Sequence, residues 1–326
     1  MSTTEIGEST AAHPATGPED FGFQWHLTDR CNLRCAHCYQ ERFDPQGERP
    51  LAELKEMADR ICAAIPGRPL QVNLTGGEPL LHPHLAELVE HLHLFPGLDE
   101  VHLITNGTVA PERLLRRLGD LPRLRWLKVS LESGDAAVND AIRGPGNLAQ
   151  VTRIIPLLRQ RCGREVILMV TLARYNVSTI RSTVALGRRI GAAGIIFERF
   201  VPLGRGRALA AQVLCPVDWL AAQEAILQVA GLDDVDPAEL HPFRAFWLWL
   251  GEEHEEPLQG ALCNLGGGSM ALMPDGTIHP CRRLPVPLGN VLAEPFPALL
   301  ERLARHDAKA DAPAGAGCRA LARALG

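Results

Sequence analysis

Short apolar runs alternate with amphipathic segments about six times between Phe21 and residue 230. A strand that is buried on both faces reads as a short apolar run, whereas a helix that covers a sheet has apolar residues three and four positions apart. Repeated strand–helix units predict a parallel sheet with helices packed outside it. This alternation constrains the fold more than any other feature of the sequence.

The predicted elements follow one another without a long gap. The strands are predicted over Gly22–Leu27, Leu70–Leu74, Glu100–Ile104, Leu127–Leu131, Glu165–Leu172 and Gly194–Phe200. The helices are predicted over Leu51–Ala64, His84–Leu94, Pro111–Leu118, Leu148–Arg161, Ser178–Ala192 and Pro216–Val229. Six units are fewer than the eight of a closed (β/α)8 barrel, so we expect an α/β fold built on a partial (β/α)6 TIM-like barrel.

Three regions are expected along the chain. Residues 1–20 are rich in small and polar residues without periodicity and are expected to form a flexible leader. Residues 21–230 would form the barrel, and residues 231–326 a small C-terminal domain with a flexible tail from Ala308. Within that domain, Pro274-Asp275-Gly276 between two apolar runs predicts a β-hairpin over Ser269–Cys281. The aromatic segment Phe243–Trp249 is expected in the core, or else as a cap over the open barrel or a partner surface.

Composition narrows the class of protein. A hydrophobic content of 46% with 22% charged residues supplies enough apolar surface for a core. The net charge of −5 gives no basic footprint for nucleic acid. No apolar run approaches the ~20 residues of a membrane span, and the N-terminus does not resemble a signal peptide, so we expect a cytoplasmic protein. In a reducing compartment, the nine cysteines are expected to bind metal or to be reactive rather than to form disulfides.

Three of these cysteines lie in one short loop directly after the first predicted strand. The segment from Cys31 to Cys38 reads CNLRCAHC, which places thiols at positions 31, 35 and 38. Thiolates at this spacing suit an iron–sulfur cluster, and three ligands leave one iron of a [4Fe–4S] cluster open to a further group. The alternatives are a zinc site with His37 as the fourth ligand, or loop cysteines without a shared role.

This loop, read from Trp25 to Tyr39, resembles the signature of the radical S-adenosylmethionine (radical SAM) enzymes. Further segments resemble that family in chain order: Thr75-Gly76-Gly77-Glu78-Pro79, Thr105-Asn106-Gly107, Ser130-Leu131-Glu132, and Phe200-Val201-Pro202-Leu203-Gly204-Arg205-Gly206. Each segment follows a predicted strand at its carboxyl end. In a parallel barrel these ends share one face, where active sites are built.

The resemblance implies two cofactors, a [4Fe–4S] cluster and S-adenosylmethionine. By resemblance, Cys31, Cys35 and Cys38 would ligate the cluster. The residues expected to bind S-adenosylmethionine are Gly76, Gly77, Glu78, Pro79, Asn106, Ser130, Glu132 and Val201. Among them, Glu78 would accept a hydrogen bond from the ammonium group, and Val201 would contact the adenine. For Ser130 and Glu132 the alternative is a hydrogen-bond network inside the barrel, and Arg143 would contact the carboxylate of the ligand or be a solvated loop arginine.

The C-terminal cysteines resemble the start of the auxiliary-cluster domain called SPASM, or of its shorter relative called twitch. Cys263 and Cys281 flank the predicted hairpin, and after them only Cys318 remains. The resemblance therefore implies at most one auxiliary [4Fe–4S] cluster, held by these three residues with an open or non-cysteine fourth position. The alternative is a degenerate domain that has lost its metal and acts as a lid.

Three other cysteines have no cluster role. Cys62 and Cys162 are expected to be small buried apolar residues. Cys215 is the candidate catalytic thiol, which would return a hydrogen atom to a substrate radical, and the alternative is a core or loop thiol.

The resemblance also implies the reaction. S-adenosylmethionine would be cleaved reductively to a 5′-deoxyadenosyl radical, with electrons from a flavodoxin- or ferredoxin-type protein. Because few residues precede the first strand, where a leader-peptide module would lie, we expect a small hydroxyl-rich substrate that is oxidised or epimerised. The alternative is a maturase that cross-links a ribosomally made peptide, and a more remote one is a non-catalytic iron–sulfur protein.

Overall fold

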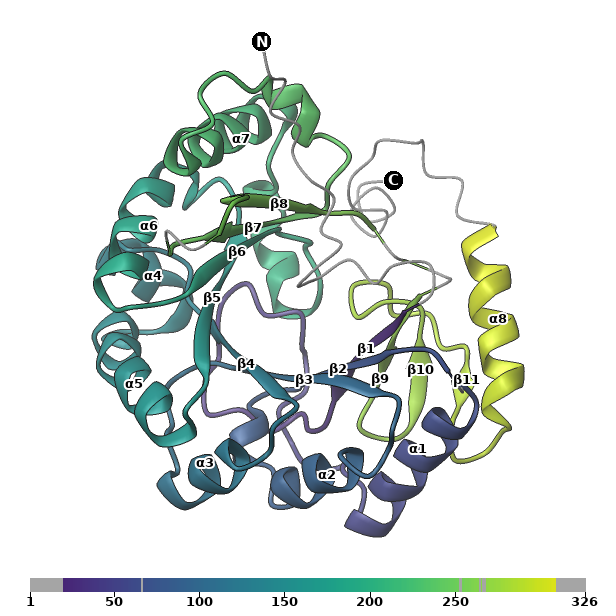
Figure 1. Ribbon diagram of the computed structural model, residues 1–326. Helices are drawn as coiled ribbons and strands as arrows, with labels where there is room; N and C mark the ends of the chain where they lie inside the picture. Colours follow the sequence, from purple (N-terminus) through teal and green to yellow (C-terminus); the bar gives the residue numbers. More distant parts are fainter. Residues whose placement is uncertain (1–19, 66, 252–253, 264, 266–267, 309–326) are drawn as a thin grey trace.

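A single curved sheet surrounds the centre of the molecule. The computed structural model describes residues 20–308, except residues 66, 252–253, 264 and 266–267. The sheet has eleven strands in the order β11-β10-β9-β1-β2-β3-β4-β5-β6-β7-β8. Figure 1 shows the strands around a central space with the helices on their outer side, while the purple segment between β1 and α1 crosses that space in this view.

The six predicted barrel strands are confirmed, and neighbours in the chain pair in parallel. They are β1 (Phe21–His26), β2 (Leu70–Thr75), β3 (Leu98–Thr105), β4 (Leu124–Ser130), β5 (Glu165–Leu172) and β6 (Gly194–Arg199). Their residues are buried along nearly the whole length, because helices cover the outer face and the interior of the barrel covers the other. The α/β fold with a partial TIM-like barrel is therefore as the sequence indicates.

The helices between these strands also agree with the prediction, with one addition. They are α1 (Leu51–Ala63), α2 (Leu85–Leu92), α3 (Glu112–Gly119), α4 (Ala136–Arg143), α5 (Asn147–Cys162), α6 (Ile180–Arg189) and α7 (Pro216–Ala230). Short 3₁₀ turns are η1 (Pro79–Leu81), η2 (Val177–Thr179), η3 (Gly204–Gln212) and η4 (Pro237–Leu240). The unpredicted helix is α4, which begins where the Asp135 side chain accepts a hydrogen bond from the Val138 amide.

Antiparallel strands extend the sheet beyond β6. Strand β7 (Ala245–Trp249) pairs with β6, and β8 (Leu258–Ala261) pairs with β7. All five residues of β7 are buried, and Trp247 packs beside Trp249 with ring centroids 5.5 Å apart. The aromatic segment is thus a core strand, and the alternative of a cap or a partner surface is wrong.

The C-terminal strands extend the sheet from its other edge. Strand β9 (Ser269–Leu272) pairs in parallel with β1, and it forms the predicted hairpin with β10 (Thr277–His279). Strand β11 (Gly289–Asn290) follows, and then the unpredicted helix α8 (Phe296–Ala308). Phe296 on α8 packs edge-on against Phe21 of β1. These contacts join residues 269–308 to the barrel sheet, while the domain boundary near residue 230 stays a prediction.

No single helix in the described part of the chain is long and apolar enough to cross a bilayer. One pair of successive helices in the same part of the chain, Gly204–Gln212 and α7, has the length and composition of a membrane span only when the two are taken together. The pair is bent by 93° where the two helices meet.

Candidate active site

The loop between β1 and α1 lies over the carboxyl ends of the barrel strands and borders a cavity. This cavity has a volume of about 150 Å³, and Cys31, Cys35 and Cys38 all line it. The opposite wall comes from residues at or just after strand ends: Thr75, Gly76, Gly77, Thr105, Asn106, Ser130, Thr171, Arg199 and Val201. The segments that the sequence analysis singled out therefore meet at one place.

Two glycines at the end of β2 hold the start of this loop. The amide of Gly77 donates to the Thr28 carbonyl at 2.6 Å, and the amide of Glu78 donates to the Arg30 carbonyl at 2.7 Å. A Cβ atom on Gly77 would lie 2.2 Å from the Arg30 carbonyl oxygen, and one on Gly76 would lie 2.5 Å from that of Thr28. The glycine pair is thus needed for the close approach of two backbone segments. This role is additional to the ligand contact that the sequence predicts for these glycines.

The end of the loop is held from the opposite side of the barrel. The Gly206 amide donates to the Cys38 carbonyl at 3.0 Å, and a Cβ atom on Gly204 would lie 2.2 Å from the Tyr39 carbonyl oxygen. The hydroxyl of Tyr39 lies 3.0 Å from His26 Nδ1 at the end of β1. Segments following β2 and β6 therefore fix the three cysteines, and this role of the glycines after β6 was not predicted.

Each sulfur of the loop accepts an N–H hydrogen bond. Cys31 Sγ accepts from the Leu33 amide at 3.4 Å, and Cys38 Sγ accepts from the Gln40 amide at 3.4 Å. Arg143 Nη1 lies 3.9 Å from Cys35 Sγ, and Asn106 Nδ2 lies 3.7 Å from Cys31 Sγ. Donors of this kind stabilise thiolates and tune iron–sulfur clusters, so the environment fits such a cluster.

The acidities of the thiols agree with this fit. Burial, with smaller effects of the neighbouring Cys35 and Cys31, raises the pKa of Cys38 to about 11, although the hydrogen bond from the Gln40 amide lowers it. Burial also raises the pKa of Cys31 and of Cys35. Three partly buried thiols whose ionisation is disfavoured by burial become stable as thiolates once a bound metal supplies positive charge.

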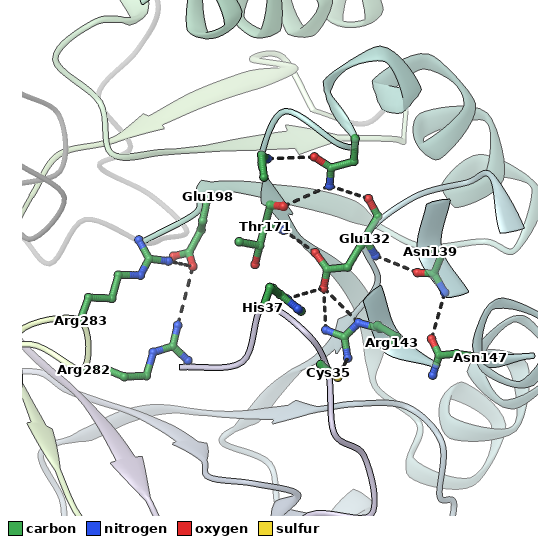
Figure 2. A network of polar contacts seen from close by, with 12 residues as sticks. Cys35, His37, Glu132, Asn139, Arg143, Asn147, Thr171, Glu198, Arg282 and Arg283 are labelled. Carbon is green, nitrogen blue, oxygen red and sulfur yellow. Dashed lines mark hydrogen bonds and ion pairs between the residues drawn. The ribbon is translucent and has the colours of Figure 1, made fainter. Parts of the chain in front are cut away.

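Glu132, two residues after β4, anchors the middle of the loop (Figure 2). Its Oε1 accepts from Arg143 Nε at 3.0 Å and Nη2 at 2.7 Å, and it lies 3.1 Å from His37 Nε2. Its Oε2 accepts from the Thr171 amide at 2.9 Å. Burial raises the pKa of Glu132, but His37 and Arg143 outweigh it and hold the pKa at about 2. Glu132 thus takes part in an interior network, which was the alternative in the sequence analysis, and Arg143 is buried rather than solvated.

This network bears on the zinc alternative. His37 Nε2 is occupied by Glu132, and His37 Nδ1 is buried on the cavity wall without a protein partner. Within the described residues, no three His, Cys, Asp or Glu side chains are arranged as ligands of a single metal ion. The geometry gives no support to a zinc site with His37, and the unpaired Nδ1 atom is suited to a polar ligand in the cavity.

Glu78 is fully buried and already has three protein partners. Its Oε1 accepts from the Leu80 amide at 3.1 Å and from Thr105 Oγ1 at 2.8 Å, and its Oε2 accepts from the Asn106 amide at 2.7 Å. Glu78 does not line the cavity in the described structure, although Gly76, Gly77 and Asn106 do. Its carboxylate ties the segment after β2 to the end of β3, and its contact with a ligand ammonium stays a prediction.

The remaining predicted residues divide between two places. Ser130 and Val201 line the cavity, and Pro79 is buried in η1 beneath it. Cys263 and Cys281 line a second cavity of about 130 Å³, and Cys281 Sγ accepts from the Arg283 amide at 3.4 Å. These two thiols share a small cluster with Val201, Leu265 and Leu284. Cys318 lies outside the described residues.

The other cysteines are not brought to the site. Cys215 is exposed and precedes α7, where its amide donates to Asp218 Oδ2 at 3.2 Å. It lines neither cavity. Cys162 is buried as expected, and Cys62 is partly buried on α1.

A second buried carboxylate was missed from the sequence. Glu198 near the end of β6 forms ion pairs with Arg244 at 3.3 Å, with Arg282 at 3.9 Å, and with Arg283. Figure 2 shows Glu198 with Arg282 and Arg283 on one side of His37 and Glu132 with Arg143 on the other. The two arginines directly after Cys281 were the sequence signal for this site. Glu198, the partner of Arg283, lies 85 positions earlier in the chain.

Comparison with known proteins identifies the family. Residues 25–187, half of the chain, match the family model described as the radical SAM superfamily. The chain belongs to this superfamily. Its members are enzymes that use a [4Fe–4S] cluster and S-adenosylmethionine, so the two cofactors expected for the first cavity are those of the family.

Curated relatives cover the chain to different extents. It is 26% identical over 305 residues to the antilisterial bacteriocin subtilosin biosynthesis protein AlbA of Bacillus subtilis, covering 90% of this chain and 64% of AlbA. It is 28% identical over 299 residues to the AdoMet-dependent heme synthase of Methanosarcina barkeri, covering 85% of this chain and 81% of that protein. It is 31% identical over 208 residues to the mycofactocin maturase MftC of Mycobacterium ulcerans, covering 61% of this chain and 54% of MftC. The chain thus spans less than two thirds of two of these relatives.

Solved structures share the fold. A structure of anSMEcpe with bound AdoMet superposes with a TM-score of 0.68 at 17% identity, covering 88% of this chain and 82% of that one. Streptococcus suis SuiB bound to its precursor peptide SuiA superposes with a TM-score of 0.65 at 14% identity, covering 92% of this chain and 66% of SuiB. Both likenesses cover too much of the chain to end at residue 230, so the shared fold includes residues beyond the six barrel units.

Proposed function

We propose that this radical SAM enzyme modifies a ribosomally made peptide. The observation that carries the proposal is the junction between the two cavities. Five residues line both: Ile104, Met169, Glu198, Arg282 and Arg283. A substrate in the second cavity would therefore adjoin the S-adenosylmethionine site on one side and the thiols of Cys263 and Cys281 on the other.

The choice of a peptide is supported by what related proteins are named for. AlbA and MftC are named for bacteriocin biosynthesis and for maturation, and SuiB was solved with a precursor peptide. The expectation of a sugar-like or cyclitol-like substrate has no such support. A small substrate that is not sugar-like is the second candidate. It is supported by the heme synthase, which is named for a small-molecule product and is, of the three relatives, the one whose length this chain covers most fully.

In this proposal the protein residues position groups and exclude water. Cys31, Cys35 and Cys38 would hold the cluster, and Asn106, Ser130 and the glycine pair would hold S-adenosylmethionine. When bound and reduced, this pair supplies a 5′-deoxyadenosyl radical that takes a hydrogen atom from an unreactive C–H bond. Burial of the wall residues keeps the substrate close and excludes competing reactions. A flavodoxin- or ferredoxin-type protein would supply electrons.

The test is the mass of a candidate peptide after turnover. Anaerobically reconstituted protein is incubated with dithionite, S-adenosylmethionine and each short peptide encoded next to the gene. We expect one peptide to raise 5′-deoxyadenosine formation and to lose about two mass units, as a cross-link requires. Cys62→Ala should match the wild type, whereas Cys31→Ala should leave the peptide unchanged. Stimulation by a tetrapyrrole or another small compound, with no change in any peptide, would favour the second candidate.

A further inference from the structure

The second cavity is lined by residues within the barrel strands and contains a buried lysine. Lys128 on β4 is 4% exposed and lines this cavity but not the first. Its Nζ donates to Asn73 Oδ1 at 2.9 Å and contacts His102 Nδ1 at 3.0 Å. The Nζ atom also lies 5.1 Å from the centroid of the Trp247 ring, which suits a cation. The ammonium is therefore held in place by residues of β2, β3 and β7.

His102 contacts both Lys128 and its partner Asn73. The Nδ1 atom of His102 lies 3.0 Å from Lys128 Nζ and 3.2 Å from Asn73 Oδ1, and its Nε2 atom lies 2.8 Å from Glu100 Oε2. The charge of Glu100 also acts on Lys128, and Glu100 is itself partly exposed.

The charges that line the second cavity do not balance. Four are cationic, Lys128, Arg244, Arg282 and Arg283, and one is anionic, Glu198. Burial lowers the pKa of Lys128 to about 7, although Glu198 and Glu100 raise it. Glu198 acts on Lys128 but is also shared by three arginines, so the one anion that lines the cavity faces four cations. Buried cations in excess of their counter-ions are costly, and a bound anion relieves that cost.

We propose that Lys128 binds a carboxylate group of the substrate in the second cavity. This rests on the proposed function in one respect, namely that the substrate enters that cavity. Arg282 and Arg283 follow Cys281 directly and are suited to an anionic cluster there, whereas Lys128 lies on β4, which carries no cysteine. A carboxylate beside Lys128 would replace none of its present hydrogen bonds, since an ammonium has three donors and the contacts with Asn73 and His102 use at most two. A neutral hydroxyl-rich ligand would leave the charge uncompensated.

The test observes Lys128 directly. The chain contains three lysines, Lys55, Lys128 and Lys309, so protein labelled with ¹³C at lysine Cε gives three sets of signals. Lys128→Met assigns the signal of interest by its loss, and if that variant fails to fold, Lys55→Arg and Lys309→Arg assign it by elimination. In the full-length protein without S-adenosylmethionine, we expect this signal to titrate near pH 7.

Added carboxylate should move this titration. The probes are acetate, N-acetylglycine and N-acetylglycinamide, each compared with chloride at equal ionic strength. We expect an acid to raise the Lys128 midpoint by about one pH unit, because an adjacent anion favours the ammonium, and to leave Lys55 unmoved. A rise with N-acetylglycine alone indicates a peptide terminus, a rise with acetate alone indicates a small organic acid, and a rise with both supports the carboxylate site for either source.

The proposal is overturned if neither acid moves the Lys128 midpoint, or if chloride or the amide moves it equally. Lys128 would then belong to an interior network without a ligand. Since the titration involves no turnover, its failure leaves the peptide experiment untouched. Conversely, a peptide that is not modified leaves the carboxylate result standing.

Discussion

His37 Nε2 lies 3.1 Å from Glu132 Oε1, so the residue between the second and third cysteines of the loop is fixed by a carboxylate that follows β4. Arg143 on α4 binds the same oxygen and also reaches Cys35 Sγ. The geometry of the cysteine loop therefore depends on an ion-pair network of His37, Glu132 and Arg143, which are not themselves cysteines.

Glu132→Gln tests this dependence. The substitution keeps the shape of the side chain but removes the charge that pairs with buried Arg143, and breaking a buried pair costs about 3 kcal/mol. We expect the free energy of unfolding in urea to fall by roughly that amount with an unchanged m-value. Glu112→Gln, in an exposed pair with Arg116, should have almost no effect. Equal stability of the two variants would mean that the network does not stabilise the loop.

Gly77→Ala tests the close approach between β2 and the loop. The added Cβ would lie 2.2 Å from the Arg30 carbonyl oxygen, which is backbone and cannot rotate away. Overpacking of this kind costs about 1–3 kcal/mol, and displacement of the loop should also lower the iron retained after reconstitution. Gly97→Ala is the control, because its Cβ would lie at an ordinary 3.5 Å from the Arg68 carbonyl oxygen. Wild-type stability and iron content in Gly77→Ala would contradict the role assigned to the glycine.

The pH dependence of stability tests the environment of Glu78. Burial raises its pKa from 4.5 to about 7, against the hydrogen bonds from Asn106, Thr105 and Leu80 that lower it. The folded state then binds a proton that the unfolded state has lost, so the contribution of Glu78 is full below pH 4.5 and disappears as the pH rises through 7. We expect the wild type to lose stability relative to Glu78→Gln across this interval in urea titrations at several pH values. A constant difference between the two proteins would show that Glu78 is ionised throughout.

Much of the site was predictable because its residues follow strand ends. The apolar runs predict β1 to β6, and the order of these strands along the chain places Cys31, Gly76, Asn106 and Ser130 on one face. The sequence did not reveal α4, because the helix is only eight residues long and two of the three residues that it buries, Asn139 and Arg143, are polar.

Other contacts could not be read from local patterns at all. Glu198 pairs with Arg283 across 85 positions, and only the folded sheet brings them together. The spacing of the motif that contains Glu78 likewise does not tell whether its carboxylate faces a ligand or the amides of its own loop. Distances between residues far apart in the chain depend on tertiary packing, which a periodic pattern does not encode.

Iron content tests the second group of cysteines. If Cys263 and Cys281 ligate an auxiliary cluster, the reconstituted wild type should contain about eight irons per chain. Cys281→Ala should then contain about four, while Cys62→Ala on α1 should equal the wild type. About four irons in all three proteins would mean that the C-terminal region holds no auxiliary cluster.

The central claim is that the three loop cysteines hold a cluster at which S-adenosylmethionine is cleaved. The most direct measurement is 5′-deoxyadenosine formed by anaerobically reconstituted, dithionite-reduced protein, quantified by mass spectrometry. The account predicts product from the wild type and from Cys62→Ala, and none from a variant with Cys31, Cys35 and Cys38 all changed to Ala. Product from the triple variant at the wild-type rate, or none from a wild type that retains its iron, would contradict it.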